Sequence, residues 1–487
     1  MICDRRELRP LGRWVGVVAV SSGLLLSSTA LMPKSAWAMS LKESIQVALE
    51  ANPEIGEAIA RREAIEFELK QAKGLYLPKI DLEARQAKQN VDNPSTRGAA
   101  QLTDEKFLDR KEFNVVASQL LFDGFGRRNE KRNQAARVDA SSHRVYERSE
   151  FIALNVVQQY LEIGRSQRVV RFARQNVAYH RRVLGDLKEG TAAQAISVAD
   201  RQQAEERVFA AEARLEEAVE DLHAARIRFF KLVGKPLEHY QRPGSITAAL
   251  PTSLQDALGT AREHNPTINI AEADVDAASA LVKKANAEFL PKISFEFTTR
   301  VADDLDGIPG QENEYRAEVV MRWNVFKGGI DSANKQEQLR VLDGERFGLH
   351  KAHRDVGEAV RLSWDRRVQQ RRRLDRLRSQ LASTNRLINS YQEQFKVGDR
   401  SLLDLLDTQN TRFNAQVSVE TAATALEFAE YRVLASMGML LNTLHLEAPK
   451  QAKIYARDAH GVPPTPEGET HKRWEPKRGG LFGRRDK

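Results

Sequence analysis

Two closely spaced histidines are candidate metal ligands in this sequence, because imidazole is a common metal ligand. His350 and His353 lie three residues apart, so on a helix they would share one face. No third ligand stands beside them, and the zinc-binding pattern His-Glu-x-x-His does not occur. We therefore interpret them as a solvated pair, and the sequence predicts no metal site and no cofactor.

Nucleophilic catalysis has no support in the sequence. The only cysteine is Cys3, in a segment that we expect to be removed, so neither a disulfide nor a catalytic thiolate is predicted. The sequence also lacks a glycine-rich phosphate loop and a recognisable pair of catalytic acids. These observations predict that the protein is not an enzyme.

Two groups of charged side chains remain as candidates. Asp404 and Asp407 lie three residues apart, so both can face one side of a helix. Their spacing alone favours two solvated acids near the positive end of a helix dipole. The basic run 366–378 and the net charge of +8 suggest nucleic acid. The run interrupts a coiled-coil helix that also carries acids, however, so we interpret it as a solvated or inter-helix salt-bridging face and predict no nucleic-acid partner.

The elements that position these residues begin after a predicted signal peptide, residues 1–38. Four arginines precede an apolar run at 14–26, and Ala36-Trp37-Ala38 has the form of a cleavage site. An uncleaved anchor is the alternative, but the cleavage site favours export. No later run of about 18 apolar residues predicts a membrane-spanning helix.

An internal repeat organises the rest of the chain. The pairs in register are Ser40-Leu41 with Ser253-Leu254, Asn52-Pro53 with Asn265-Pro266, and Leu77-Pro78-Lys79-Ile80 with Leu290-Pro291-Lys292-Ile293. The sequence therefore predicts two structural repeats, 39–240 and 251–446. The tail 447–487 is basic and contains proline and glycine, so we expect it to be disordered.

Each repeat has the same order of elements. A helical segment, 41–76 or 254–289, ends at a Leu-Pro pair, and alternating apolar and polar residues follow it. This pattern predicts two β-hairpins, 79–122 and 292–326, each with one apolar and one polar face.

Two long proline-free stretches, 126–234 and 329–447, complete the repeats. Apolar residues recur in them at seven-residue spacing, which is typical of coiled coils. Gly190 and Gly398 interrupt the pattern, so we predict that each stretch forms an antiparallel helical hairpin with its tip at the glycine.

Four strands with an apolar face cannot close a barrel, and lipid does not tolerate open sheet edges. Closure must therefore come from other chains. Three chains would supply twelve strands, an even number that suits an outer-membrane barrel.

With this organisation the sequence resembles the TolC family of outer-membrane efflux and secretion channels. The residues that carry the resemblance are the repeated Asn-Pro and Leu-Pro-Lys-Ile motifs, the turns Phe122-Asp123-Gly124 and Phe326-Lys327-Gly328, and the tip segment 397–407. The resemblance implies an α+β membrane protein. Its long coiled-coil helices would form a trimeric α-barrel, and four strands per chain would contribute to a trimeric 12-stranded β-barrel in outer-membrane lipid.

The resemblance also implies site residues and partners. Asp404 and Asp407 match the acidic rings of the closed periplasmic entrance, and Arg400 and Asp200 match a polar latch that opens when broken. Phe395 stands where the family's namesake has a tyrosine, so one latch bond is missing. Gly190 also lies about one turn farther from Asp200 than the family spacing. The implied partners are a homotrimer, a periplasmic adaptor (membrane fusion) protein, and an inner-membrane ABC or RND pump.

The predicted function is a passive exit duct of a tripartite efflux or type I secretion system. A periplasmic coiled-coil adaptor or scaffold without a pore is the alternative, since it would explain the heptads but not the alternating hairpins. The segment 203–207 favours the secretion branch over the lipid-anchored drug-efflux branch. The sequence leaves the cargo open.

Overall fold

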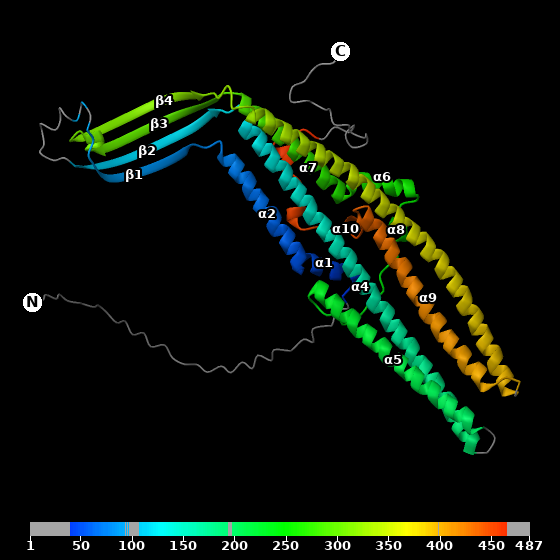
Figure 1. Ribbon diagram of the computed structural model, residues 1–487. Coiled ribbons are helices and arrows are strands. Elements are labelled where there is room, and N and C mark those ends of the chain that lie inside the picture. The colour runs from blue at the N-terminus through cyan, green and yellow to red at the C-terminus, as the bar shows by residue number, and fades with distance from the viewer. Residues whose placement is uncertain are drawn as a thin grey trace, which may run out of the picture. The chain divides into compact units, whose positions relative to one another are not determined.

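The computed structural model describes residues 39–92, 94, 96, 107–192, 197–397 and 399–464. The predicted signal peptide 1–38 therefore lies outside the described residues. A four-stranded sheet joins long paired helices (Figure 1). This combination confirms the fold class that the sequence predicts at the level of one chain.

Two short helices open each half of the chain, where the sequence predicted a single helix. They are α1 (Leu41–Ala51) and α2 (Pro53–Gly74), and then α6 (Leu254–His264) and α7 (Pro266–Ala285). The break falls at Asn52 and Asn265, whose backbones are extended and whose side chains cap the second helix. The following proline has no N–H to donate and starts a helix well, so this is the place where the axis changes.

The four strands form one antiparallel sheet in the order β1-β2-β3-β4 (Figure 1). Their bounds are β1 Lys79–Gln89, β2 Leu108–Phe122, β3 Lys292–Asp303 and β4 Gln311–Arg322. The register of β2 with β3 shifts between Leu120 and Phe122, which leaves Leu121 outside the regular pairing. β4 ends four residues before the predicted end of its hairpin at 326.

Each sheet connection leads into a helix of unusual length. α4 (Gly126–Ala192) and α8 (Ile330–Lys396) have 67 residues each, and they pair with the return helices α5 (Val198–Val233) and α9 (Leu402–Ser436). At 1.5 Å per residue the long helices extend for about 100 Å. Gly190 lies in the last turn of α4, which ends two residues later, and Gly398 lies outside the described residues.

The main core lies where the short helices pack against the long ones. Its largest fully buried side chains include Tyr160, Phe229 and Tyr431, and the Tyr160 hydroxyl donates a hydrogen bond to the Gln241 carbonyl (2.7 Å). Each Asn cap also holds a return helix in this core: Asn52 donates to Leu232 O (3.0 Å) and Asn265 to Ser436 O (2.9 Å). Each half thus contains the same contact, a hydrogen bond from the Asn cap to a carbonyl of its return helix.

The chain after the second half is ordered as far as residue 464, where the sequence predicted disorder. The buried Asp139 carboxylate of α4 accepts hydrogen bonds from the backbone N–H groups of Tyr455, Ala456 and Arg457, at 2.9–3.1 Å. The Arg457 guanidinium also pairs with Asp276 of α7 (2.9 Å). These charge-assisted bonds stabilise the segment in spite of its composition. Residues 465–487 lie outside the described part.

The remaining short elements are η1 (Thr247–Ala249), η2 (Asn286–Phe289), η3 (Leu305–Gly307), α10 (Leu440–Thr443), η4 (Lys450–Ala452) and α11 (Ala456–Ala459). In the part of the chain that the structure describes, no helix is both long and apolar enough to cross a membrane.

The Gly438→Ala substitution tests the contact between α9 and the start of α7. Gly438 has a φ of +76°, and a Cβ there would lie 2.7 Å from Pro266 Cδ and 2.8 Å from His264 O. We expect a loss of about 1–3 kcal/mol in the free energy of unfolding, measured by thermal unfolding in detergent. Gly185→Ala in α4 is the control, since a Cβ there meets nothing within 4 Å. Equal stability of the two variants would contradict this account.

Candidate functional site

The predicted acids lie at the start of α9, where the local sequence fixes their positions. Ser401 is the N-cap, and its hydroxyl accepts a hydrogen bond from the Asp404 N–H (3.2 Å). Leu402, Leu405 and Leu406 turn into the core, so Asp404 and Asp407 are left half-exposed on the surface of the first two turns. Both carboxylates are thus presented at the tip of the second helical hairpin.

Arg400 lies directly before the cap and contacts its own hairpin. Its guanidinium lies 3.7 Å from the Asp404 carboxylate, donates to Gln394 Oε1 (2.9 Å) and stacks over the Tyr391 ring at 4.6 Å. Asp200 lies in the first turn of α5, and no ion pair joins it to Arg400 within the chain. The structure of one chain therefore does not bring the two predicted latch residues together. Phe395 lies in the last turn of α8 with 36% of its surface exposed.

Asp407 has a partner that the sequence did not suggest. Arg207 of α5 donates to the Asp407 carboxylate at 3.0 Å and so joins the first helical hairpin to the second. Next to this bond, Arg214 donates to the Asn410 side chain. The tip thus contains a polar connection between hairpins that lie 200 residues apart in sequence.

Beneath this connection, apolar side chains of three helices pack together. Their members are Leu184, Leu187, Ala204, Val208, Leu402 and Leu406. A polar contact and a buried histidine lie close by in the same seam. Gln409 donates to Asn176 (3.0 Å), and His180 is 3% exposed, with its pKa lowered to about 4 by burial and by Arg207 and Arg214. His180 is therefore neutral at ordinary pH and adds no charge to the tip. Its place in the coiled-coil seam was the only sequence signal for it.

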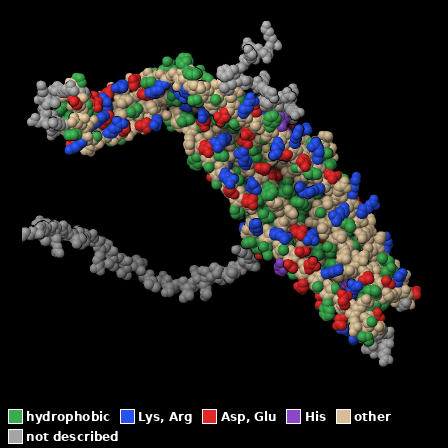
Figure 2. All heavy atoms as spheres, viewed as in Figure 1, with side chains coloured by type: hydrophobic (Ala, Val, Ile, Leu, Met, Phe, Trp, Pro, Cys, Tyr) green, Lys and Arg blue, Asp and Glu red, His purple; other side chains and the backbone are tan. Residues whose placement is uncertain are grey.

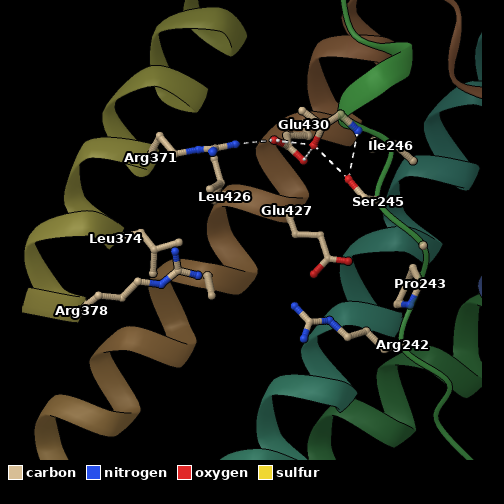
Figure 3. Close-up of a pocket in the computed structure, with 13 residues that line it drawn as sticks. Arg242, Pro243, Ser245, Ile246, Arg371, Leu374, Arg378, Leu426, Glu427 and Glu430 are labelled. Carbon is tan, nitrogen blue, oxygen red and sulfur yellow. Dashed lines mark hydrogen bonds and ion pairs between the residues drawn. The ribbon is translucent and has the colours of Figure 1, made fainter. Parts of the chain in front are cut away.

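A second charged region lies midway along the second hairpin, in a cavity of about 430 Å³ between α8, α9 and residues 242–247 (Figure 3). Glu430 is buried there and accepts a hydrogen bond from Arg371 (3.3 Å), with Arg367 at 3.9 Å. Glu427 points toward Arg242, while burial raises the pKa of the Glu427 carboxyl. Two members of the basic run 366–378 therefore form inter-helix salt bridges.

One carboxylate in the main core has no counter-charge. Glu150 of α4 is 4% exposed and accepts hydrogen bonds from the N–H groups of Leu440 (3.2 Å) and Leu441 (2.9 Å) at the start of α10. Burial raises its pKa to about 7, because these backbone bonds only partly replace the lost water. The protonation of the Glu150 carboxyl therefore makes the stability of the core depend on pH.

The histidine pair is less exposed than the interpretation as a solvated pair requires. His350 and His353 are both half-buried on α8. Among the described residues, no group of three or more His, Cys, Asp or Glu side chains is arranged to hold a metal ion.

Comparison with known proteins defines the class. A profile of the outer membrane efflux protein family matches residues 44–235 and 257–439, which is more than half of the chain. The chain therefore belongs to the outer membrane efflux protein family, and the resemblance to TolC-family channels is confirmed.

The relatives agree with this assignment. The outer membrane efflux protein BepC of Brucella suis is 25% identical over 86% of this chain and 90% of its own length. The outer membrane protein TolC of Escherichia coli K12 is 21% identical over 91% of both chains. The alkaline protease secretion protein AprF of Pseudomonas aeruginosa is 22% identical over 84% of this chain and 85% of its own.

A solved structure shows the same fold. The outer membrane channel CmeC of Campylobacter jejuni superimposes with a TM-score of 0.71 at 18% identity, and the match covers 82% of this chain and 86% of that one.

The Arg207→Gln substitution tests the connection between the hairpins. Removing the guanidinium frees Asp407 from α5, so we expect amide exchange in the first turns of α9 to become about two- to fivefold faster, as the loss of a partly exposed ion pair allows. Hydrogen–deuterium exchange with mass spectrometry measures this. Arg181→Gln is the matched control, because Arg181 pairs with Glu212 inside the first hairpin (2.7 Å). If both variants change exchange in α9 equally, the Arg207–Asp407 bond has no special role.

The Glu150→Gln substitution tests the pH dependence. Because the native pKa of about 7 lies above the ordinary 4.5, the native state keeps a proton that the unfolded state releases in this window. The free energy of unfolding therefore falls as the pH rises from about 4.5 to 7. We expect the variant to lose this part of the slope in thermal unfolding scans. Glu147→Gln, at an exposed position of the same helix, should keep the wild-type slope. A wild-type slope in Glu150→Gln would show that the carboxyl does not titrate there.

Proposed function

We propose that the protein is one subunit of a homotrimeric outer-membrane duct, through which substrates leave the cell passively. The observation that carries this proposal is the sheet. Its four strands have one apolar and one ion-paired face, and both edge strands, β1 and β4, lack an outer partner in the described part of the chain.

The two faces suit two different surroundings. On one face, large apolar side chains are exposed, and Tyr315 is an example at 73%. The others on the same face include Ile80, Leu82, Phe295, Phe297, Val319 and Met321. On the other face, ion pairs cross from strand to strand, such as Arg300 with Glu314 (2.8 Å) and Arg322 with Glu296 (2.7 Å). Apolar-out and polar-in is the pattern of an outer-membrane barrel with an aqueous interior.

The edges require further copies of the chain. A strand edge in lipid leaves N–H and C=O groups without partners, and each costs several kcal/mol. Pairing β4 of one copy with β1 of the next removes both edges. Three copies close a barrel with an even number of strands, as bacterial barrels have. The helical hairpins of the same copies would then continue the conduit in the periplasm, after export by a cleaved signal peptide.

The tips are the proposed gate. Asp404 and Asp407 of three copies would place carboxylates around the entrance, where they attract cations and repel one another. Arg400 and Arg207 neutralise part of this charge, and Arg207 also holds α9 against α5. A pairing of Arg400 with Asp200 of the neighbouring copy remains our proposal for the latch, with Phe395 beside it and the helix turns near Gly190 and Gly398.

The family supports a place in a tripartite system, with a periplasmic adaptor and an inner-membrane ABC or RND pump. AprF is an alkaline protease secretion protein, and BepC is an outer membrane efflux protein. Proteins and small toxic compounds are therefore both proposed cargo classes. The alternative, a periplasmic scaffold without a pore, gives no role to the exposed apolar face of the sheet.

Reconstitution in planar bilayers tests the proposal. We expect the purified wild type to run as a heat-sensitive trimer and to form cation-selective pores. The double variant Asp404→Asn, Asp407→Asn should lower the cation preference by about twofold or more, since it removes charge at the constriction. The control is Glu216→Gln, Glu217→Gln, at exposed positions of α5.

Two outcomes would contradict the proposal at different levels. If the wild type stays a water-soluble monomer without conductance, the proposal of a duct is wrong. If the double variant forms pores of unchanged selectivity, the proposal of a duct stands, but Asp404 and Asp407 do not lie at its entrance.

A further inference from the structure

A cavity of about 320 Å³ lies where the sheet joins the helices, and its charged lining consists of cations alone. Arg128 and Arg132 come from the first turns of α4, and Lys283 comes from the last turn of α7. The other lining residues are Gly124, Phe125, Asn129, Asn286 and Leu290. No carboxylate lines this cavity.

The three cations differ from three other cations of the same junction. Lys284 pairs with Glu130 (2.8 Å), Lys292 with Glu288 (3.1 Å) and Lys327 with Asp331 (3.4 Å). Arg128, Arg132 and Lys283 form no ion pair with any of the described residues. Several cations near the junction are thus neutralised by acids, whereas the three that face the cavity are not; Lys131, also without an ion pair among the described residues, lies over the Tyr76 ring at 5.2 Å.

The arrangement is unfavourable without an anion. Arg128 and Arg132 are four residues apart, so they lie on one face of α4 and repel each other. Burial and the charge of Arg128 lower the pKa of Arg132, and the Arg132 Nε is buried without a hydrogen-bond partner. The first turn of α4 also contains no acidic residue. An anion between the three side chains would relieve the repulsion and accept their hydrogen bonds.

The cavity lies at the level where the proposed barrel would leave the membrane. Exposed aromatic and aliphatic side chains surround the same junction, and Figure 2 shows hydrophobic side chains gathered on the surface there. They include Tyr76, Phe125, Phe289, Trp323 and Phe326. The Trp323 indole N–H donates to Phe289 O (3.3 Å), and the Trp323 ring is exposed. Such aromatic belts mark the membrane–water interface, where lipid phosphates lie.

In the proposed assembly, the cavity faces outward. An added Cβ at Gly461 would lie 3.9 Å from Arg132 Nη2, so Arg132 is on the side covered by the ordered segment before residue 464. That segment would obstruct the conduit if it lay inside, so in the proposed assembly it lies outside. This step rests on the proposed function.

We propose that this cavity binds the phosphate of an anionic phospholipid in the inner leaflet of the outer membrane. Arg128, Arg132 and Lys283 would hold the phosphate, and the Asn129 and Asn286 side chains lie within the same lining. Phe125 and Leu290, 55% and 41% exposed, would contact the start of an acyl chain. Gly124 allows the backbone on this side of the cavity to lie close to Ala287, because a Cβ there would meet Ala287 O at 2.8 Å.

The test compares thermal unfolding of the purified protein in neutral detergent with increasing phosphatidylglycerol or phosphatidylcholine. We expect phosphatidylglycerol to raise the wild-type Tm more than phosphatidylcholine does. The triple variant Arg128→Gln, Arg132→Gln, Lys283→Gln should need about tenfold more phosphatidylglycerol for the same shift. The matched control, Lys284→Gln, Lys292→Gln, Lys327→Gln, removes the same charge from paired cations and should respond like the wild type.

Three results would overturn the inference. They are an unchanged response of the triple variant, an equal loss in the control, or an equal Tm shift with soluble glycerol 3-phosphate, which would indicate a free-phosphate site. If the triple variant does not assemble, native mass spectrometry of the wild type in an equal mixture of phosphatidylglycerol and phosphatidylethanolamine decides. Enrichment of bound phosphatidylglycerol supports the site, and equal proportions contradict it. Pore conductance in zwitterionic bilayers reports separately on the proposed duct.

Discussion

The outer edges of β1 and β4 impose the constraint on which the rest of the structure depends. Their backbone N–H and C=O groups have no partner strand among the residues that the structure describes, and the apolar face beside them is exposed. A lipid environment supplies no water to such groups, so the edges have to meet other edges. Once copies stand side by side, their long helices also stand side by side, and the tips of the second hairpins come to surround a common axis.

The duplicated halves meet this constraint with one set of local devices. In both, a capped short helix ends at Asn-Pro, and the Asn side chain donates to a carbonyl near the end of the return helix. The two halves differ at their tips, where Arg207 of the first half donates a hydrogen bond to Asp407 of the second. The repeated parts hold the framework, and the parts that differ between the halves carry the candidate gate.

The strands and long helices could be predicted from the sequence because period-two and seven-residue patterns are local. The sequence did not reveal the Arg207–Asp407 bond, since its partners are 200 residues apart and both resemble ordinary surface charges. The docked segment was missed for the same reason: its composition suggests disorder, but Asp139, more than 300 residues earlier, binds its backbone. The break at Asn52 was visible as a motif, but its change of helix axis depends on tertiary packing.

The uninterrupted course of α4 and α8 has a mechanical consequence. Each continues for 67 residues from near a strand end toward a tip. A straight helix of this length is stiff, so a sideways displacement at the tip cannot be absorbed by a joint along it. It has to be taken up by sliding and twisting of the paired helices against each other, or at the glycines that precede them, Gly124 before α4 and Gly328 and Gly329 before α8, all with positive φ. In the proposed assembly, torque applied at the tips would therefore reach the glycines beside the sheet.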